Sequence, residues 1–147
     1  MHLPMFIDLT HKRILVAGGG AVAGRRIRVL FGFCRHITVV APEISPEINS
    51  LGLDIYRREF KPSDLDGKDI VLAATDDAQV NRQIAGLCRR RGILVNNCSD
   101  QRLCDFQFPA VVQSGDIVIG INSSGKNHGL VRETRRKIES MENFIEE

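Results

Sequence analysis

Residues 13–27 read RILVAGGGAVAGRRI, and three glycines there separate a short apolar run from an arginine-rich segment. Ile14–Ala17 is typical of a buried strand in a parallel sheet. Beyond the glycines, apolar residues recur at steps of four, three and four and predict one buried helical face: Ala23, Ile27, Leu30 and Cys34. A glycine triplet alone fits a flexible linker, a sharp turn or a phosphate cradle. The strand before it and the helix after it favour the cradle.

The spacing Gly18-x-Gly20-x-x-Ala23 matches the dinucleotide-binding fingerprint, which joins a strand to a helix. The first glycine permits the tight turn, the second lets the backbone approach the pyrophosphate, and the small third residue lets the helix pack close to the strand. The pyrophosphate then lies on the N–H groups that begin the helix. A strand-to-helix turn that binds nothing is the alternative. The predicted cofactor contacts are Gly18, Gly19, Gly20, Ala21 and Val22.

The second predicted strand, His36–Ala41, ends at Pro42 without the acidic residue that usually binds the ribose hydroxyls. Glu43 follows directly, so ribose recognition is expected from backbone groups or from Glu43. Ala41, Pro42 and Glu43 are therefore further candidate cofactor contacts. No arginine stands at this strand end to bind a 2′-phosphate, which favours NAD over NADP.

The strand–helix alternation continues along the chain. Ile70–Ala74 and Ile93–Val95 are typical of buried strands, and between them a helix carries Val80, Ile84 and Leu87 and ends at Gly92. A short helix is expected within 43–51 and a strand at Leu53–Arg57. Together these elements predict an α/β, Rossmann-like, doubly wound parallel sheet. Polar residues after the strand at 70–74 either cap the next helix or contact the cofactor: Thr75, Asp76 and Asn81.

The pattern changes after residue 100. FQFPAVVQ and DIVIGIN predict a β-hairpin around Ser114-Gly115. A terminal helix from Asn127 carries an apolar stripe, Val131, Thr134, Ile138, Met141 and Ile145, which must be buried on its own domain or on a second subunit. The expected organisation is a nucleotide-binding domain at 1–105 and an extension at 106–147 that dimerises and binds substrate.

Composition limits the class of protein. With 147 residues, 43% of them hydrophobic, and a net charge of +2, the chain is an ordinary globular protein, too balanced to predict nucleic-acid binding. It contains no run of about 18 apolar residues, and its N-terminus does not resemble a signal peptide, so we expect a cytoplasmic protein without a membrane span. The four cysteines have no C-x-x-C spacing and are expected to be reduced thiols. No metal site is predicted, although Cys98, Cys104 and a distant histidine form a conceivable one.

The chain resembles precorrin-2 dehydrogenase, the N-terminal module of siroheme synthases. The resemblance covers roughly residues 5–140. It rests on ILVAGGGAVAGRR, TVVAPEIS, RREFKPSDLDG, VLAATDDAQVNRQIA, RGILVNNCSD, LCDFQFPAVV and IVIGINSSGK. It implies an NAD-dependent oxidoreductase of siroheme biosynthesis that converts precorrin-2, a reduced tetrapyrrole, to sirohydrochlorin, and a homodimer with a swapped dimerisation region. Family members commonly continue into a helical domain beyond this point, and some also insert iron.

The resemblance also implies catalytic and substrate-binding residues. The family has an aspartate before the CDF motif. An ungapped alignment places it on Ser99 and a one-residue shift on Asp100, and we favour Asp100 because serine is a poor base. The predicted substrate contacts are Asp105, Ser123, Ser124, Lys126 and His128. The loop that holds the last four is one residue shorter than in the family, which puts its contacts in question.

Two other functions stay open. The chain could be a sirohydrochlorin chelatase, or it could bind a tetrapyrrole or nucleotide without turnover. The sequence does not determine the metal or the branch of tetrapyrrole synthesis.

Overall fold

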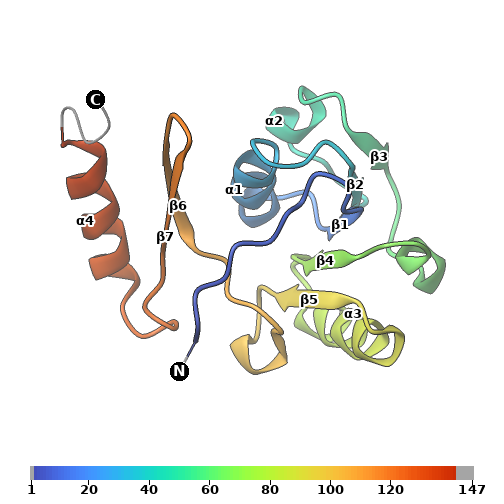
Figure 1. Cartoon of the computed structure of the whole chain (residues 1–147). Helices are drawn as coiled ribbons and strands as arrows, with labels where there is room; N and C mark the ends of the chain where they lie inside the picture. Colours follow the sequence, from blue (N-terminus) through green and yellow to red (C-terminus); the bar gives the residue numbers. More distant parts are fainter. Residues whose placement is uncertain (1, 142–147) are drawn as a thin grey trace. The chain divides into compact units, whose positions relative to one another are not determined.

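The computed structural model describes residues 2–141, which divide into two compact units (Figure 1). One unit comprises residues 7–106, and the other comprises the segments on either side of it. The sequence placed the boundary at residues 105 and 106 and assigned the first six residues to the nucleotide-binding domain, whereas here they group with the C-terminal segment. None of the described helices is long and apolar enough to cross a membrane.

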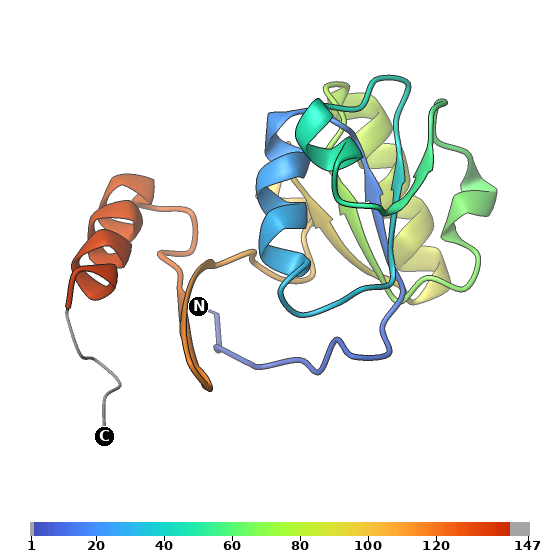
Figure 2. The same cartoon turned by 90° about the horizontal axis from the view of Figure 1, so that it is seen from above.

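The larger unit is a five-stranded parallel sheet with the order β3-β2-β1-β4-β5, which confirms the predicted fold class. The strand order reverses beside β1. Because crossovers between parallel strands are right-handed, the helix after β1 and the helix after β4 cover opposite faces, as Figure 2 shows. The strands are β1 (Ile14–Ala17), β2 (Ile37–Val40), β3 (Asp54–Tyr56), β4 (Ile70–Ala73) and β5 (Leu94–Asn97). The helices are α1 (Ala21–Leu30), α2 (Pro46–Asn49) and α3 (Ala78–Arg91), with short 3₁₀ turns η1 (Pro62–Leu65) and η2 (Gln101–Leu103).

The main core lies between the sheet and α3. Val71 and Ala73 of β4 pack with Ile84, Ala85 and Cys88 of α3, and all are almost fully buried. Burying each large aliphatic side chain contributes about 1.5–3 kcal/mol relative to exposure. Burial also raises the pKa of Cys88 to about 11, so this thiol is a neutral packing group at physiological pH.

Three predicted boundaries were wrong. Helix α1 ends at Leu30, so Cys34, which was predicted on its face, is buried in the segment after the helix. β5 runs past Val95 to include Asn96 and Asn97, both 3% exposed. Hydrogen bonds let Asn96 stay buried: the Arg26 guanidinium donates to Asn96 Oδ1, and Asn96 Nδ2 donates to the Phe106 carbonyl at 2.8 Å. The strand expected at 106–113 begins only at Ala110, directly after Pro109, which has no N–H to donate.

The smaller unit contains an antiparallel hairpin and a helix. β6 (Ala110–Ser114) pairs with β7 (Ile117–Ile121), and Gly115 in the turn adopts φ +54°. Helix α4 (His128–Glu139) packs against the hairpin through the predicted stripe, since Val131, Thr134 and Ile138 are partly buried. Ile145, the last residue of that stripe, lies outside the described residues.

Candidate active site

The glycine turn between β1 and α1 is fixed by backbone contacts. Gly18 adopts φ +131°, and a Cβ there would overlap the carbonyl oxygen of Ala74. A Cβ on Gly19 would overlap the carbonyl oxygen of Glu43. Gly18 N donates to Val40 O, and Ser45 N donates to Gly19 O, both at 2.9 Å. The turn is therefore held between the loops that follow β2 and β4, with no room for side chains.

Gly20 differs, because a Cβ there would meet no atom within 4 Å. It begins α1 at φ −89° without a side-chain cap, and the first turn of the helix carries no acidic residue. Ala21 and Val22 present exposed side chains beside it. Open space, uncapped N–H groups and the absence of negative charge in this turn fit the pyrophosphate of a dinucleotide.

The end of β2 lies beside this turn. Ala41 is buried and donates its N–H to Tyr56 O at 3.1 Å, whereas Pro42 and Glu43 are exposed. Glu43 therefore presents a carboxylate at the position where the sequence predicted ribose recognition.

Asn81 is fully buried, and its amide is completely hydrogen-bonded. Its Oδ1 accepts from Thr75 N at 3.0 Å and from Thr75 Oγ1 at 2.7 Å. Its Nδ2 donates to Thr75 O at 2.9 Å and to Ser99 Oγ at 2.5 Å. Asp76 is exposed, and the cap of α3 is Asp77, which accepts from Gln79 N and Val80 N. Asn81 thus links the loop after β4 to the loop after β5.

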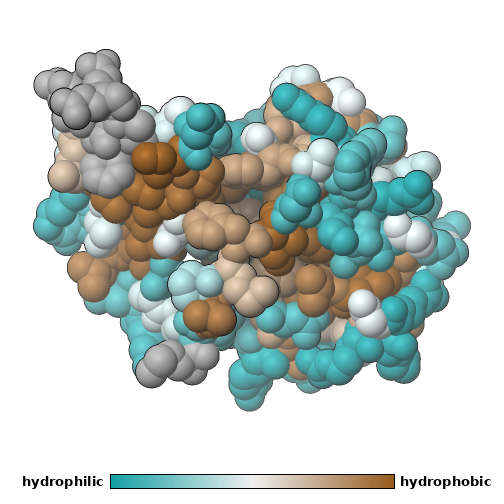
Figure 3. Space-filling view, viewed as in Figure 1, coloured by the Kyte–Doolittle hydropathy of each residue, from teal (hydrophilic) through white to brown (hydrophobic). Residues whose placement is uncertain are grey.

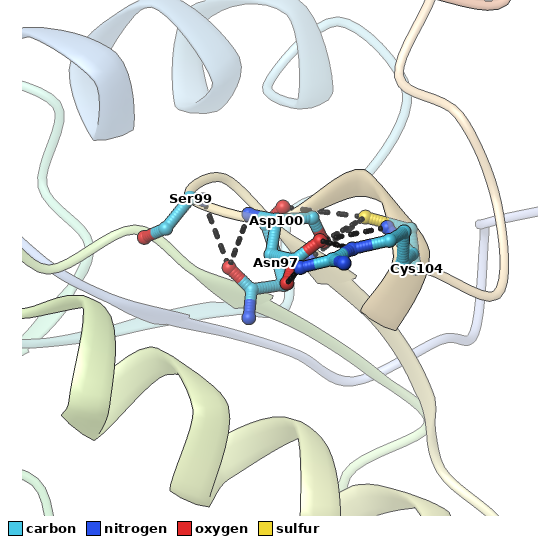
Figure 4. Close-up of polar contacts among 5 residues, drawn as sticks. Asn97, Ser99, Asp100 and Cys104 are labelled. Atoms are coloured by element: carbon cyan, nitrogen blue, oxygen red, sulfur yellow. Dashed lines mark hydrogen bonds and ion pairs between the residues drawn. The ribbon is translucent and has the colours of Figure 1, made fainter.

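The loop after β5 carries both candidate catalytic residues. Asn97 Oδ1 accepts from Ser99 N at 2.8 Å and from Asp100 N at 3.2 Å, as Figure 4 shows. The Ser99 side chain points away from the Asp100 carboxylate in this view. Asn97 therefore fixes both residues. Sequence reasoning missed it, although an asparagine two residues before a serine is a common side-chain-to-backbone turn.

Asp100 is paired with Arg102, a second residue that the sequence reasoning did not identify. The two ends of the Asp100 carboxylate accept from Arg102 Nε at 3.0 Å and from an Arg102 terminal nitrogen at 2.9 Å. These hydrogen bonds hold the pKa of Asp100 below its ordinary value. The carboxylate is therefore ionised at neutral pH, and it also caps η2 by accepting from Arg102 N.

The segment after η2 closes the outer edge of β5. Val95 exchanges hydrogen bonds with Asp105, whose N donates to Val95 O at 2.8 Å and whose Oδ2 accepts from Val95 N at 2.9 Å. Asn97 N donates to Cys104 Sγ at 3.1 Å. Burial raises the pKa of the Cys98 and Cys104 thiols. The described Asp105 contacts are structural, and its substrate contact stays a prediction.

Of the remaining predicted substrate residues, Ser123, Ser124 and Lys126 lie in the β7–α4 loop of the smaller unit, and His128 begins α4. Ser123 Oγ accepts from Asn127 N at 3.0 Å, and Ser124, at φ +54°, hydrogen-bonds through Oγ with His2 Nδ1 at 2.8 Å. Lys126 and His128 are exposed. The structure thus places Ser123, Ser124 and Lys126 in one loop and His128 at the start of the helix that follows it. The cofactor and catalytic candidates lie at the carboxyl edge of the larger unit's sheet.

Within residues 2–141, no group of three or more His, Cys, Asp or Glu side chains is arranged to hold a metal ion. The described cysteines are all free thiols.

Comparisons with known proteins agree with this geometry. A family described as "Putative NAD(P)-binding" matches residues 5–110. Siroheme synthase of Psychrobacter sp. (strain PRwf-1) is 41% identical over 142 residues, which cover 94% of this chain and 29% of that protein. Siroheme synthase of Photorhabdus laumondii is 38% identical over 144 residues, 95% of this chain and 31% of that protein. The chain therefore spans about three tenths of the length of these relatives.

Among solved structures, SirC, a precorrin-2 dehydrogenase, superposes with a TM-score of 0.79 at 29% sequence identity. The match covers 95% of this chain and 70% of that one. The chain thus belongs to the NAD(P)-binding family that includes the N-terminal module of siroheme synthase and the SirC precorrin-2 dehydrogenase.

Proposed function

We propose that this chain oxidises precorrin-2 to sirohydrochlorin, with NAD⁺ as the hydride acceptor. The observation that carries the proposal is the similarity to the precorrin-2 dehydrogenase SirC, which extends over 95% of this chain. The glycine turn and the first turn of α1, with Gly20 open to solvent, would hold the pyrophosphate. NAD is preferred over NADP because Glu43, at the end of β2, would bind ribose hydroxyls and repel a 2′-phosphate.

Residues of this chain would then carry out proton transfer and substrate binding. Bound NAD⁺ supplies a hydride acceptor at its nicotinamide ring. Asp100 lies in the loop after β5 and would accept the proton that leaves the substrate, with Ser99 beside it. Ser123, Ser124, Lys126 and His128 would bind the carboxylates of the tetrapyrrole through hydroxyl and cationic groups. Asp105 would contact the substrate from the β5 edge.

We further propose that the chain forms a homodimer through the smaller unit and acts in the cytoplasm. Leu3 and Phe6 are about four-fifths exposed, at 81% and 78%, and Leu130 of α4 is 55% exposed. Figure 3 shows apolar side chains gathered over the β6–β7 hairpin. Apolar surface of this kind is typical of a subunit interface.

An assay with purified chain, precorrin-2 and NAD⁺ tests the activity. We expect NADH to form in proportion to the sirohydrochlorin absorbance, with a much smaller rate when NADP⁺ replaces NAD⁺. Asp100→Asn should lower kcat by roughly 10²-fold or more, because a positioned general base contributes that much. Tetrapyrrole binding without NADH formation at saturating substrate would contradict the proposal and favour a binding module.

A further inference from the structure

The orientation of the buried Asn81 amide is determined by its neighbours. Thr75 offers it one backbone N–H and one carbonyl, at 3.0 and 2.9 Å. If the amide were turned over, its NH₂ group would face the Thr75 N–H, and its oxygen would face the Thr75 carbonyl oxygen. Neither pair can form a hydrogen bond at these short distances. The oxygen therefore faces Thr75 N, and the nitrogen faces Thr75 O and Ser99 Oγ.

This orientation fixes the role of the Ser99 hydroxyl. The Asn81 Nδ2 group can only donate hydrogen bonds, so Ser99 Oγ is the acceptor in the 2.5 Å bond between them. A serine hydroxyl has one hydrogen of its own, and no acceptor for it is recorded within residues 2–141. Ser99 is exposed, and its backbone is fixed by Asn97. The hydroxyl is thus a positioned donor that can point outward.

The position of Ser99 indicates what it meets. Dinucleotides bind across the carboxyl edge of such sheets, with the pyrophosphate beside β1 and the two nucleosides on either side of it. The adenosine half extends over β2, so the nicotinamide half extends over β4 and β5. Ser99 follows β5 at this edge, and Asn81 connects it to the end of β4.

We propose that Ser99 donates its hydroxyl hydrogen to the carboxamide oxygen of the nicotinamide, and that Asn81 is the positioning residue that holds Ser99 in this role. The bond would fix the rotation of the nicotinamide ring. A carbonyl oxygen fits this site because the Ser99 hydroxyl still has its hydrogen to donate, and a carbonyl oxygen accepts such a hydrogen. The inference rests on the dinucleotide-binding part of the proposed function and is independent of the tetrapyrrole.

Calorimetric titration with NAD⁺ and with ADP-ribose, which lacks the nicotinamide, tests this proposal. Ser99→Ala should weaken NAD⁺ binding about three- to tenfold, the value of one hydrogen bond, and leave ADP-ribose binding unchanged. Ser99→Thr keeps the hydroxyl and should restore most of the NAD⁺ affinity. Ser63→Ala removes an exposed serine hydroxyl in η1 and serves as the matched control. Thermal unfolding of each variant confirms that it is folded.

Three outcomes would overturn the proposal. Unchanged NAD⁺ affinity in Ser99→Ala would show that the hydroxyl does not meet the cofactor, including the case in which only the KM for precorrin-2 rises. Equal weakening of NAD⁺ and ADP-ribose would indicate a general disturbance of the site through Asn81. Weakening in Ser99→Thr as large as in Ser99→Ala would show that the hydroxyl is not the group that matters. None of these readouts needs turnover, so loss of the dehydrogenase activity would be a separate result.

Discussion

The glycine turn after β1 and the loop after β5 lie at the same edge of one sheet, yet they are held in different ways. The turn is held by backbone contacts, and Gly18 and Gly19 have no space for a Cβ. The loop is held by side chains, with Asn97 and Asn81 anchoring Ser99 and with Arg102 paired to Asp100. A phosphate needs bare N–H groups at a fixed position, whereas proton transfer and ring orientation need side chains that can be placed individually.

Substitutions in the two loops should therefore affect the stability of the chain in different ways. A steric change in the glycine turn meets backbone atoms of β2 and β4 loops, which cannot move without disturbing the sheet. A side-chain change in the β5 loop removes hydrogen bonds that water can partly replace.

The largest effect is expected from alanine at Gly18. Gly18→Ala forces a positive φ on an L-residue and overlaps the Ala74 carbonyl, which should cost about 3 kcal/mol or more. The matched variant Gly20→Ala has free space and an ordinary φ, so its free energy of unfolding should fall only by about 0.5–1 kcal/mol, the difference between glycine and alanine at a helix N-cap. Its NAD⁺ affinity should still fall, because the methyl group occupies the space of the pyrophosphate.

Urea unfolding and NAD⁺ titration of this pair give the comparison. Equal stability of Gly18→Ala and Gly20→Ala would show that the turn is not fixed by its backbone neighbours. Undiminished NAD⁺ affinity in Gly20→Ala would place the pyrophosphate elsewhere.

An intermediate effect is expected from Asn97→Ala, which removes the acceptor for Ser99 N and Asp100 N. The cost should be about 1–2 kcal/mol, because Asn97 Nδ2 is buried with no hydrogen-bond partner among the described residues and its loss offsets part of the damage. Hydrogen exchange of the Ser99 and Asp100 amides should accelerate. Asn122→Ala, which removes an exposed acceptor for Ser124 N, is the control and should cost less. Unchanged exchange at both amides would refute the anchoring role.

The smallest effect is expected from Arg102→Gln, and it should depend on pH. Arg102 lowers the pKa of Asp100 in the folded chain, so the unfolded chain binds more protons in this range. The stabilisation is complete well above the ordinary value of 3.8 and is lost as the pH falls through the lower folded pKa. Wild type and Arg102→Gln should thus differ slightly in stability at pH 7 and converge at a pH below the folded pKa of Asp100. A difference that persists at that pH would mean that the pair acts through packing instead of charge.

Periodicity and turn chemistry in the sequence predicted most of the fold. Four of the five strands follow from short apolar runs and β3 from alternation, and the turn between β1 and α1 follows from the glycine spacing. The end of β5 was missed because Asn96 and Asn97 are polar, and the hydrogen bonds of Asn96 to Arg26 and Phe106, which lie far from it along the chain, make that residue compatible with burial. The partner of Asp100 was missed because a neighbouring arginine is usually solvated, and nothing in its spacing distinguishes Arg102.

The sequence by itself determined the parallel sheet, the glycine turn between β1 and α1, and the family, because hydrophobic period, glycine spacing and local motifs are properties of neighbouring residues. Only the tertiary structure decided what Ser99, Asp100 and Asn81 can do. Asn81 and Ser99 are 18 residues apart along the chain and meet through adjacent strand ends, and their bond leaves Ser99 as a donor. The direction of a hydroxyl and the charge state of a carboxylate depend on atoms that only folding brings within hydrogen-bond distance.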